Sequence, residues 1–147
     1  MPCLCHRAII LALTCLVLAA CEGQSSDSPD EAVRQRLVGS WLREYEQDGA
    51  QVRRWLVLQD DGHFSETARI VEASGTVTQL AHAGEWTYDG TNLKRRYTRV
   101  DGKQPAAPTL PYATFALRFE SRNEFVGADH VRHREVRYQR VNEGALQ

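Results

Sequence analysis

Two side chains in the middle of the chain have the chemistry of a general acid–base pair. Glu66 and His82 can both exchange protons, and as an enzyme pair they would have to reach one substrate across a cleft. The surrounding motifs do not support catalysis. Ser40 has no nucleophile-elbow motif and no neighbouring base, no glycine-rich phosphate loop occurs, and Asp60-Asp61-Gly62 is typical of a hairpin turn. We therefore predict that the chain is not an enzyme and has no catalytic residues.

A second pair of side chains has the spacing of possible metal ligands. His130 and His133 lie three residues apart in a stretch predicted to be extended, where such residues point to opposite faces of a strand. Arg132 and Arg134 beside them would repel a cation. We expect neither a metal ion nor a cofactor.

The cysteines lie near the amino terminus, in a segment organised like a secretory leader. His6 and Arg7 precede an apolar run, Ala8–Leu18, which is too short to span a bilayer and ends in small residues. We predict that residues 1–20 are a signal peptide; an uncleaved anchor or a buried helix is the alternative. Cys3, Cys5 and Cys15 would be removed with it, which leaves Cys21.

Leu18-Ala19-Ala20-Cys21 resembles the lipobox of bacterial lipoproteins. The resemblance implies that the Cys21 thiol receives a diacylglyceryl group and that cleavage precedes it. The new amino terminus is then usually acylated, with palmitate as the expected kind of chain. One acyl chain binds a membrane only marginally, whereas two or more give stable anchoring. Glu22 in place of Asp favours the outer membrane in the enterobacterial sorting rule, so we expect a lipid-anchored envelope protein facing the periplasm.

Composition narrows the functions open to residues 21–147, which are enough for one domain. With Cys21 lipidated, no thiol remains for a disulfide, a metal site or a nucleophile. The formal net charge of the whole chain is −1, so there is no electrostatic case for binding nucleic acid.

The elements after the leader begin with a polar stretch, residues 21–28, that is predicted to be a flexible tether. A helix over residues 29–38 should follow, because Ser28 can cap it, Pro29 suits its first position and Glu31 completes a capping box. Residues 143–147 are expected to be a tail.

The remainder of the chain alternates apolar and polar residues, and Asp-Gly pairs separate the segments. This pattern predicts an all-β domain, an up-and-down antiparallel barrel of about eight strands. One long connection, residues 102–111, holds three prolines and is a candidate lid or partner contact. The predicted strands are Ser40–Gln47, Gln51–Gln59, His63–Ala73, Thr76–Tyr88, Thr91–Val100, Tyr112–Glu120, Glu124–Ala128 and His130–Val141.

Gly39-Ser40-Trp41, at the start of the first strand after a short helix, resembles the signature of lipocalin-like (calycin) barrels. The resemblance implies a lipocalin-like domain over residues 29–142. In that family the tryptophan closes the barrel floor and an arginine of the last strand stacks across it. Trp41 and Arg140 are the matching residues here, with Arg137 in reserve.

Alternation also predicts what faces the interior. On the fifth strand, Arg95 and Arg99 should share the inward face with Tyr97. The second strand has apolar residues on both faces, Trp55 and Val57 on one and Leu56 and Leu58 on the other, so its pattern does not show which face points inward. The inward polar groups either converge on a ligand or pair with one another in a filled barrel. The candidate cavity residues are Trp41, Tyr45, Glu66, His82, Trp86, Tyr97 and Phe115.

Two functions remain open. The first is non-catalytic binding of a small apolar or amphipathic molecule, such as a lipid-like compound whose anionic head meets an arginine. The alternative is a protein-interaction or inhibitor module with a filled barrel, which docks on an envelope protein through a patch near Trp55 or the proline-rich loop.

Overall fold

The computed structural model describes residues 28–106 and 112–142. In this part of the chain one helix precedes eight antiparallel strands, and each strand pairs with the next. The last strand also pairs with the first, so the sheet closes into an up-and-down barrel and confirms the predicted fold class. The elements are α1 (Pro29–Leu37), β1 (Gly39–Gln47), β2 (Ala50–Leu58), β3 (His63–Val71), β4 (Val77–Tyr88), β5 (Asn92–Val100), β6 (Tyr112–Ser121), β7 (Glu124–Asp129) and β8 (Arg134–Val141).

Helix α1 begins as the sequence predicts. The Oγ of Ser28 accepts a hydrogen bond from the backbone N–H of Glu31 at 3.2 Å, and Pro29 occupies the first turn. The helix ends at Leu37, one residue before the predicted boundary, and Leu37 is its buried residue. The helix therefore presents its carboxyl-terminal end to the barrel.

Asp-Gly pairs form the turns that the sequence predicts. Asp48 and Gly49 between β1 and β2 have φ angles of 52° and 77°. Asp101 and Gly102 after β5 have φ angles of 49° and 73°. Positive φ at both central residues is what a two-residue type I′ hairpin turn requires, and aspartate followed by glycine is one of the pairs that adopt it readily.

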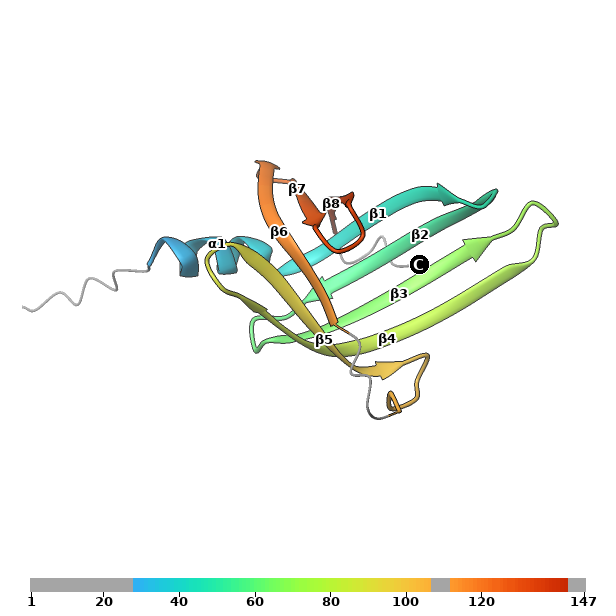
Figure 1. Cartoon of the computed structure of the whole chain (residues 1–147), viewed down its shortest axis with the longest axis horizontal. Helices are drawn as coiled ribbons and strands as arrows, with labels where there is room; N and C mark the ends of the chain where they lie inside the picture. Colours follow the sequence, from blue (N-terminus) through green and yellow to red (C-terminus); the bar gives the residue numbers. More distant parts are fainter. Residues whose placement is uncertain (1–27, 107–111, 143–147) are drawn as a thin grey trace, which may run out of the picture.

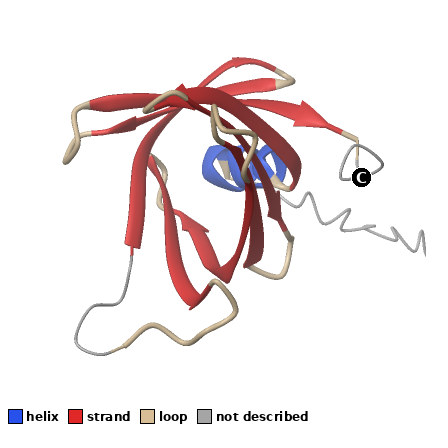
Figure 2. Cartoon of the chain, turned by 90° about the vertical axis from the view of Figure 1, so that its right-hand side faces the viewer, coloured by secondary structure: helices blue, strands red, loops and turns tan. Residues whose placement is uncertain are grey.

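The barrel has two different ends. Arg34 and Arg36 of α1 reach the β2–β3 turn at Asp60 and the end of β6 at Ser121, so α1 lies over the turns at this end, which we call the closed end. The β1–β2, β3–β4, β5–β6 and β7–β8 connections lie at the other end, the open end. Figure 1 shows α1 and the long hairpins at opposite ends. Figure 2 looks in from the hairpin end, with α1 across the far end.

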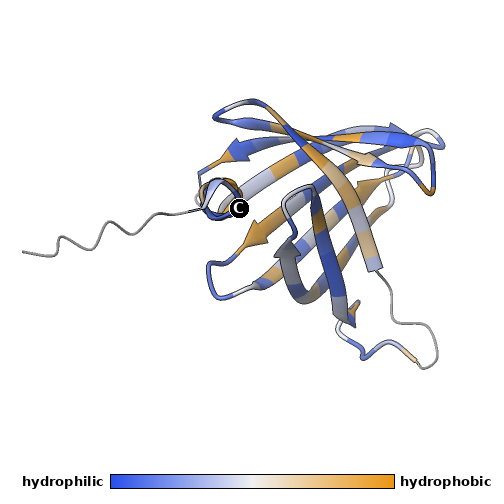
Figure 3. Cartoon of the chain, turned by 60° about the vertical axis from the view of Figure 1, so that its left-hand side comes forward, coloured by the Kyte–Doolittle hydropathy of each residue, from blue (hydrophilic) through white to orange (hydrophobic). Residues whose placement is uncertain are grey.

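Hydropathy alternates along the strands, as Figure 3 shows, and burial follows this alternation. On β3, Phe64, Glu66 and Ala68 are buried and the residues between them are exposed. Strand β2 also has a definite inward side, which the sequence pattern left open. Val52 and Leu56 are buried there, whereas Trp55 lies on the outer wall.

Strand β5 corrects one predicted face. Gly84 pairs with Tyr97 and Ala83 pairs with Arg99, so Thr98 is an extra residue in β5. This bulge reverses the alternation, and Val100 instead of Arg99 is placed opposite His82. The prediction that Arg99 faces the interior is therefore wrong; Arg99 is exposed.

Strand β8 begins at Arg134, four residues later than predicted. The Oδ1 of Asp129 accepts hydrogen bonds from the backbone N–H groups of Val131 and Arg132, at 3.1 and 3.0 Å, and closes a turn. His130 and His133 lie in this turn, and His133 has a φ of 50°. The argument that strand geometry separates the two histidines is therefore wrong, because neither residue is on a strand.

Candidate ligand-binding site in the open half of the barrel

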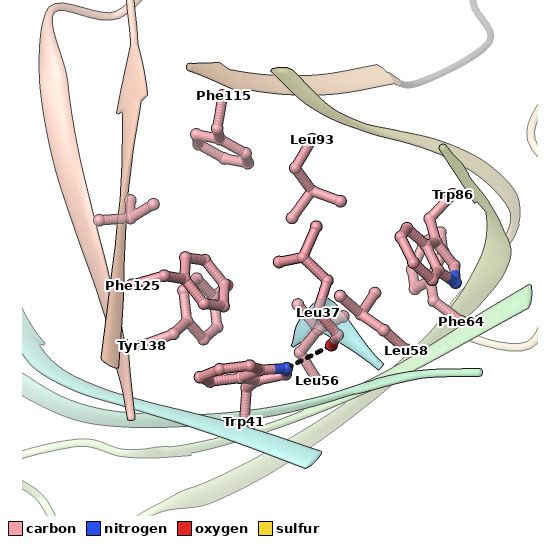
Figure 4. Close-up of a cluster of buried hydrophobic side chains, with 11 residues drawn as sticks. Leu37, Trp41, Leu56, Leu58, Phe64, Trp86, Leu93, Phe115, Phe125 and Tyr138 are labelled. Atoms are coloured by element: carbon pink, nitrogen blue, oxygen red, sulfur yellow. Dashed lines mark hydrogen bonds between the residues drawn. The ribbon is translucent and has the colours of Figure 1, made fainter. Parts of the chain in front are cut away.

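The closed half of the barrel is filled by apolar side chains. Trp41 is 0 % exposed, and its Nε1 donates a hydrogen bond of 2.7 Å to the carbonyl oxygen of Leu37 (Figure 4). The guanidinium carbon of Arg140 lies 4.2 Å from the centre of the Trp41 ring, and Arg140 Nη1 donates to the carbonyl oxygen of Val38 at 2.9 Å. The buried cluster comprises Leu37, Trp41, Leu56, Leu58, Phe64, Trp86, Leu93, Phe115, Phe125, Val136 and Tyr138, of which Phe115 and Tyr138 lie at the boundary with the open half.

Trp86 belongs to the same filled half. Its side chain is buried, its Nε1 donates to the carbonyl oxygen of Gln59 at 2.8 Å, and the guanidinium of Arg34 lies 5.2 Å from its ring. Trp41 and Trp86 were both predicted to line a ligand cavity, but the structure packs them against other side chains near α1. They stabilise the closed end.

A buried ion cluster lies where the apolar packing ends. Glu66 is 2 % exposed, and its two carboxylate oxygens accept hydrogen bonds from Arg54 at 2.7 Å and from Arg95 at 2.6 Å. The Nε of Arg54 donates to the hydroxyl of Tyr45 at 2.9 Å. Each oxygen of this carboxylate thus has its own charged donor, which is the arrangement a buried charge needs.

The strand register brings this cluster together. Leu56 is the cross-strand partner of Glu66 and Ala68 that of Arg54, so Arg54 and Glu66 are diagonal neighbours on the inward faces of β2 and β3. Arg95 reaches the same carboxylate from β5, across the interior. Its guanidinium also lies 5.5–5.6 Å from the centres of three aromatic rings, those of Phe64, Tyr97 and Phe115.

The environment shifts several pKa values in this cluster. Burial by itself would raise the pKa of Glu66, but Arg95 and Arg54 outweigh it and hold that pKa below its ordinary value. Burial raises the pKa of Tyr97 to about 12. Burial lowers the pKa of the Arg43 guanidinium, and nearby Arg134 and Arg54 add to the effect. Glu66 is therefore an anion at neutral pH, and Tyr97 keeps its proton.

A cavity of about 550 Å³ at the open end is lined by Tyr45 and Arg54 of the ion cluster and by residues of the β1–β2 and β3–β4 turns. Two smaller cavities in the open half also include Glu66 in their lining. The larger of these two, hereafter the larger cavity, has a volume of about 300 Å³, and Arg43, Tyr45 and Tyr97 are among its lining residues. The smaller, of about 200 Å³, is lined by Arg54, Glu66, His82, Tyr97 and Val100. The remaining lining residues of the larger cavity are Gln47, Arg54, Glu66, Arg95, Tyr112, Ala113, Phe115, Arg132, Arg134 and Tyr138.

Five of the seven predicted cavity residues line these two spaces. Tyr45, Glu66, Tyr97 and Phe115 line the larger cavity, and His82 lines the smaller one. Glu66 and His82 are cross-strand partners, but Glu66 is held by two arginines, and the Nδ1 of His82 accepts a hydrogen bond from the backbone N–H of Asp101 at 3.2 Å. The geometry gives Glu66 the role of fixing arginines at the cavity wall.

Arg54 is the member of the ion cluster that sequence reasoning missed. Around Trp55, strand β2 has apolar residues on both faces. The inward alternation of Val52, Arg54 and Leu56 was therefore not apparent from the sequence. The signal that could have identified Arg54 is its period-two spacing from Val52 and Leu56, which places it between two inward apolar residues.

A separate groove lies on the outer wall. Trp55 and Val57 of β2, Arg69 of β3 and Gln79 of β4 contribute to a volume of about 440 Å³ outside the barrel. Arg53 also lines the groove, with its guanidinium 5.1 Å from the centre of the Trp55 ring. This is the region in which the sequence predicted an exposed patch.

No protein-family model matches the chain, and no curated protein matches it. Across residues 28–106 and 112–142, no three histidine, cysteine, aspartate or glutamate side chains are grouped so that they could hold a metal ion. In the same residues, no helix has both the length and the apolar character needed to cross a membrane. Cys21 and the lipobox-like segment lie outside the described residues.

Proposed function

We propose that this chain is a lipid-anchored envelope protein whose lipocalin-like barrel binds a small amphipathic molecule without catalysis. The proposal rests on one observation, the difference between the two halves of the barrel interior. The closed half is packed with apolar side chains, whereas the open half has a cavity of about 300 Å³ beside buried charged groups. A cavity that combines aromatic walls with a few fixed polar groups is typical of a small-molecule site.

The proposed location is the outer membrane, with the domain facing the periplasm, and it rests on the lipobox-like sequence at Cys21. Ser28, which follows the proposed tether, lies at the amino-terminal end of α1, and α1 covers the closed end. The cavity lies in the open half, and the β1–β2 and β3–β4 hairpins of that half lie at the opposite end of the barrel from α1 (Figure 1). This arrangement supports uptake of a molecule from the periplasm.

The test is to recover the natural ligand and then block the cavity. Protein purified after expression of the full chain is examined by native mass spectrometry for a bound small molecule from the envelope. Ala113→Trp fills the larger cavity, whereas Thr114→Trp places the same ring on the exposed side of the same strand. We expect the first variant alone to lose the molecule. Retention by both variants, or no bound molecule in any preparation, would contradict the proposal.

The outer groove supports a second candidate function, docking on an envelope protein. Two observations favour this function. Trp55 lies in a groove of about 440 Å³ on the outer wall, and the Nε1 of Trp55 is buried without a hydrogen-bond partner in the described residues. Cross-linking in cells should then trap a discrete partner that Trp55→Ala loses. A cross-linking pattern unchanged by that substitution would count against this function.

A further inference from the structure

The larger cavity has more positive than negative charge in its wall. Glu66 is the one carboxylate among its lining residues, and it is already paired with Arg54 and Arg95. Arg132 and Arg134 at the open end are paired with Asp129, at 3.1 and 3.7 Å. These two carboxylates account for four of the five arginines that line the space.

Arg43 is the fifth arginine, and it differs from the others. Its guanidinium lies 4.0 Å from the centre of the Tyr45 ring, and within the described ranges no carboxylate forms an ion pair with it. The neighbouring groups that act on its charge are two tyrosines, Tyr138 and Tyr45, and two other arginines. A partly buried guanidinium among like charges is stabilised by an added anion.

The shape of the cavity limits what the anion can carry. A volume of about 300 Å³ corresponds to about ten water molecules in the liquid, at about 30 Å³ each. Further extension toward α1 is blocked because Trp41, Leu56 and Leu58 are fully buried in the packed half. The space suits a compact ring system, and the packed half leaves no room for a long acyl chain to extend toward α1.

The walls favour a planar ligand. The aromatic residues around the cavity offer ring faces, and the guanidinium of Arg43 is a planar group that stacks on such faces while it binds a carboxylate through two parallel hydrogen bonds. Aromatic side chains on β1, β5, β6 and β8 contribute to the lining: Tyr45, Tyr97, Tyr112, Phe115 and Tyr138.

We propose that the ligand is a small aromatic carboxylic acid, whose carboxylate binds Arg43 and whose ring lies among the tyrosines of the larger cavity. This inference rests on the proposed function, because it names the ligand class of the same site. It departs from the lipid-like ligand that the sequence suggests, because the acid is a compact ring system without a long acyl chain.

Three probes separate the parts of the proposal. 2-Naphthoate is the aromatic acid, 2-naphthamide has nearly the same shape without the charge, and decanoate has the charge on a flexible chain of similar size. Binding to protein purified after expression of the full chain is measured by isothermal titration calorimetry. We expect 2-naphthoate to bind at least about tenfold more tightly than either other probe, because a hydrogen bond to a charged group contributes about 1.5–3 kcal/mol.

Variants then test Arg43 itself. Arg43→Met should weaken 2-naphthoate binding about tenfold or more and leave 2-naphthamide unchanged, whereas Arg43→Lys should restore part of the affinity. Arg137→Met, which removes an arginine from the outer face of β8, is the matched control and should change neither. Thermal melting of each variant shows that the barrel remains folded.

Equal binding of 2-naphthoate and 2-naphthamide, or an Arg43→Met variant that binds 2-naphthoate normally, would overturn the inference. Absence of binding by both naphthyl probes would also overturn it. The proposed function would survive those results if native mass spectrometry still showed a bound molecule that Ala113→Trp displaces, so the two proposals fail separately.

Discussion

Replacement of Glu66 by glutamine tests the role given to the buried ion cluster. Glutamine keeps nearly the same volume but removes the charge that both Arg54 and Arg95 contact. Removal of one partner from a buried ion pair costs about 3–5 kcal/mol of folding free energy, because the other charge stays buried and unpaired. The side chain of Arg95 is only 4 % exposed, whereas that of Arg54 is 25 % exposed and still contacts Tyr45. We therefore expect about 3 kcal/mol, with Arg95 responsible for most of it.

The assay is urea denaturation of both proteins, with Glu44→Gln as the matched control. Glu44 pairs with Arg53 at 2.6 Å on the outer face of the barrel, where both side chains are about half exposed. An exposed pair contributes about 0–1 kcal/mol, so the control should change stability little. A Glu66→Gln variant no less stable than Glu44→Gln would refute the buried-cluster reasoning.

The same residue predicts a pH dependence. The folded-state pKa of Glu66 lies below its ordinary value, which is about 4.3 in an unfolded chain. As the pH falls below about 4.3, the unfolded state takes up this proton first, so the contribution of Glu66 to stability is present at higher pH and is lost as the pH approaches the folded-state pKa. The stability difference between the original protein and Glu66→Gln should therefore shrink on acidification. A constant difference between neutral pH and pH about 3 would contradict this.

Three further predictions concern the closed end, the barrel wall and the anchor. Trp41→Ala should lower the free energy of unfolding by about 3–5 kcal/mol in urea denaturation, because it empties the packed floor; a change near zero would contradict the packing. Gly84→Ala should prevent normal pairing of β4 with β5, since its Cβ would lie 1.9 Å from the carbonyl oxygen of Arg96; a normal melting temperature would argue against that close approach. Cys21→Ser should release the protein from membranes on cell fractionation, and continued membrane association would contradict the lipobox interpretation.

The fold was largely predictable because its signals are local. Asp-Gly turns need positive φ, and Asp48-Gly49 and Asp101-Gly102 adopt it. Period-two alternation located every strand to within a few residues, except at the β7–β8 turn. There, Asp129 closes a turn through its side chain, and a short polar segment of this kind resembles an extended one in sequence.

The site was predictable only in part because it depends on contacts between distant strands. Alternation placed Tyr45, Glu66 and Tyr97 inside, but it could not show that β5 reaches across the barrel so that Arg95 binds Glu66. Alternation also could not show where along the barrel the apolar packing ends and the cavity begins. Trp86 was predicted to line the cavity because it points inward, yet it lies in the filled half under α1.

The central claim is that a ligand enters the open half of the barrel and contacts Arg43. The three tryptophans make this directly measurable by nuclear magnetic resonance, because Trp41 and Trp86 lie in the filled half and Trp55 lies on the outer wall. On titration with 2-naphthoate, we predict that the side-chain N–H signal of Arg43 shifts while all three indole N–H signals stay in place. A shift of the Trp55 indole without a shift of Arg43 would contradict the account and place binding in the outer groove.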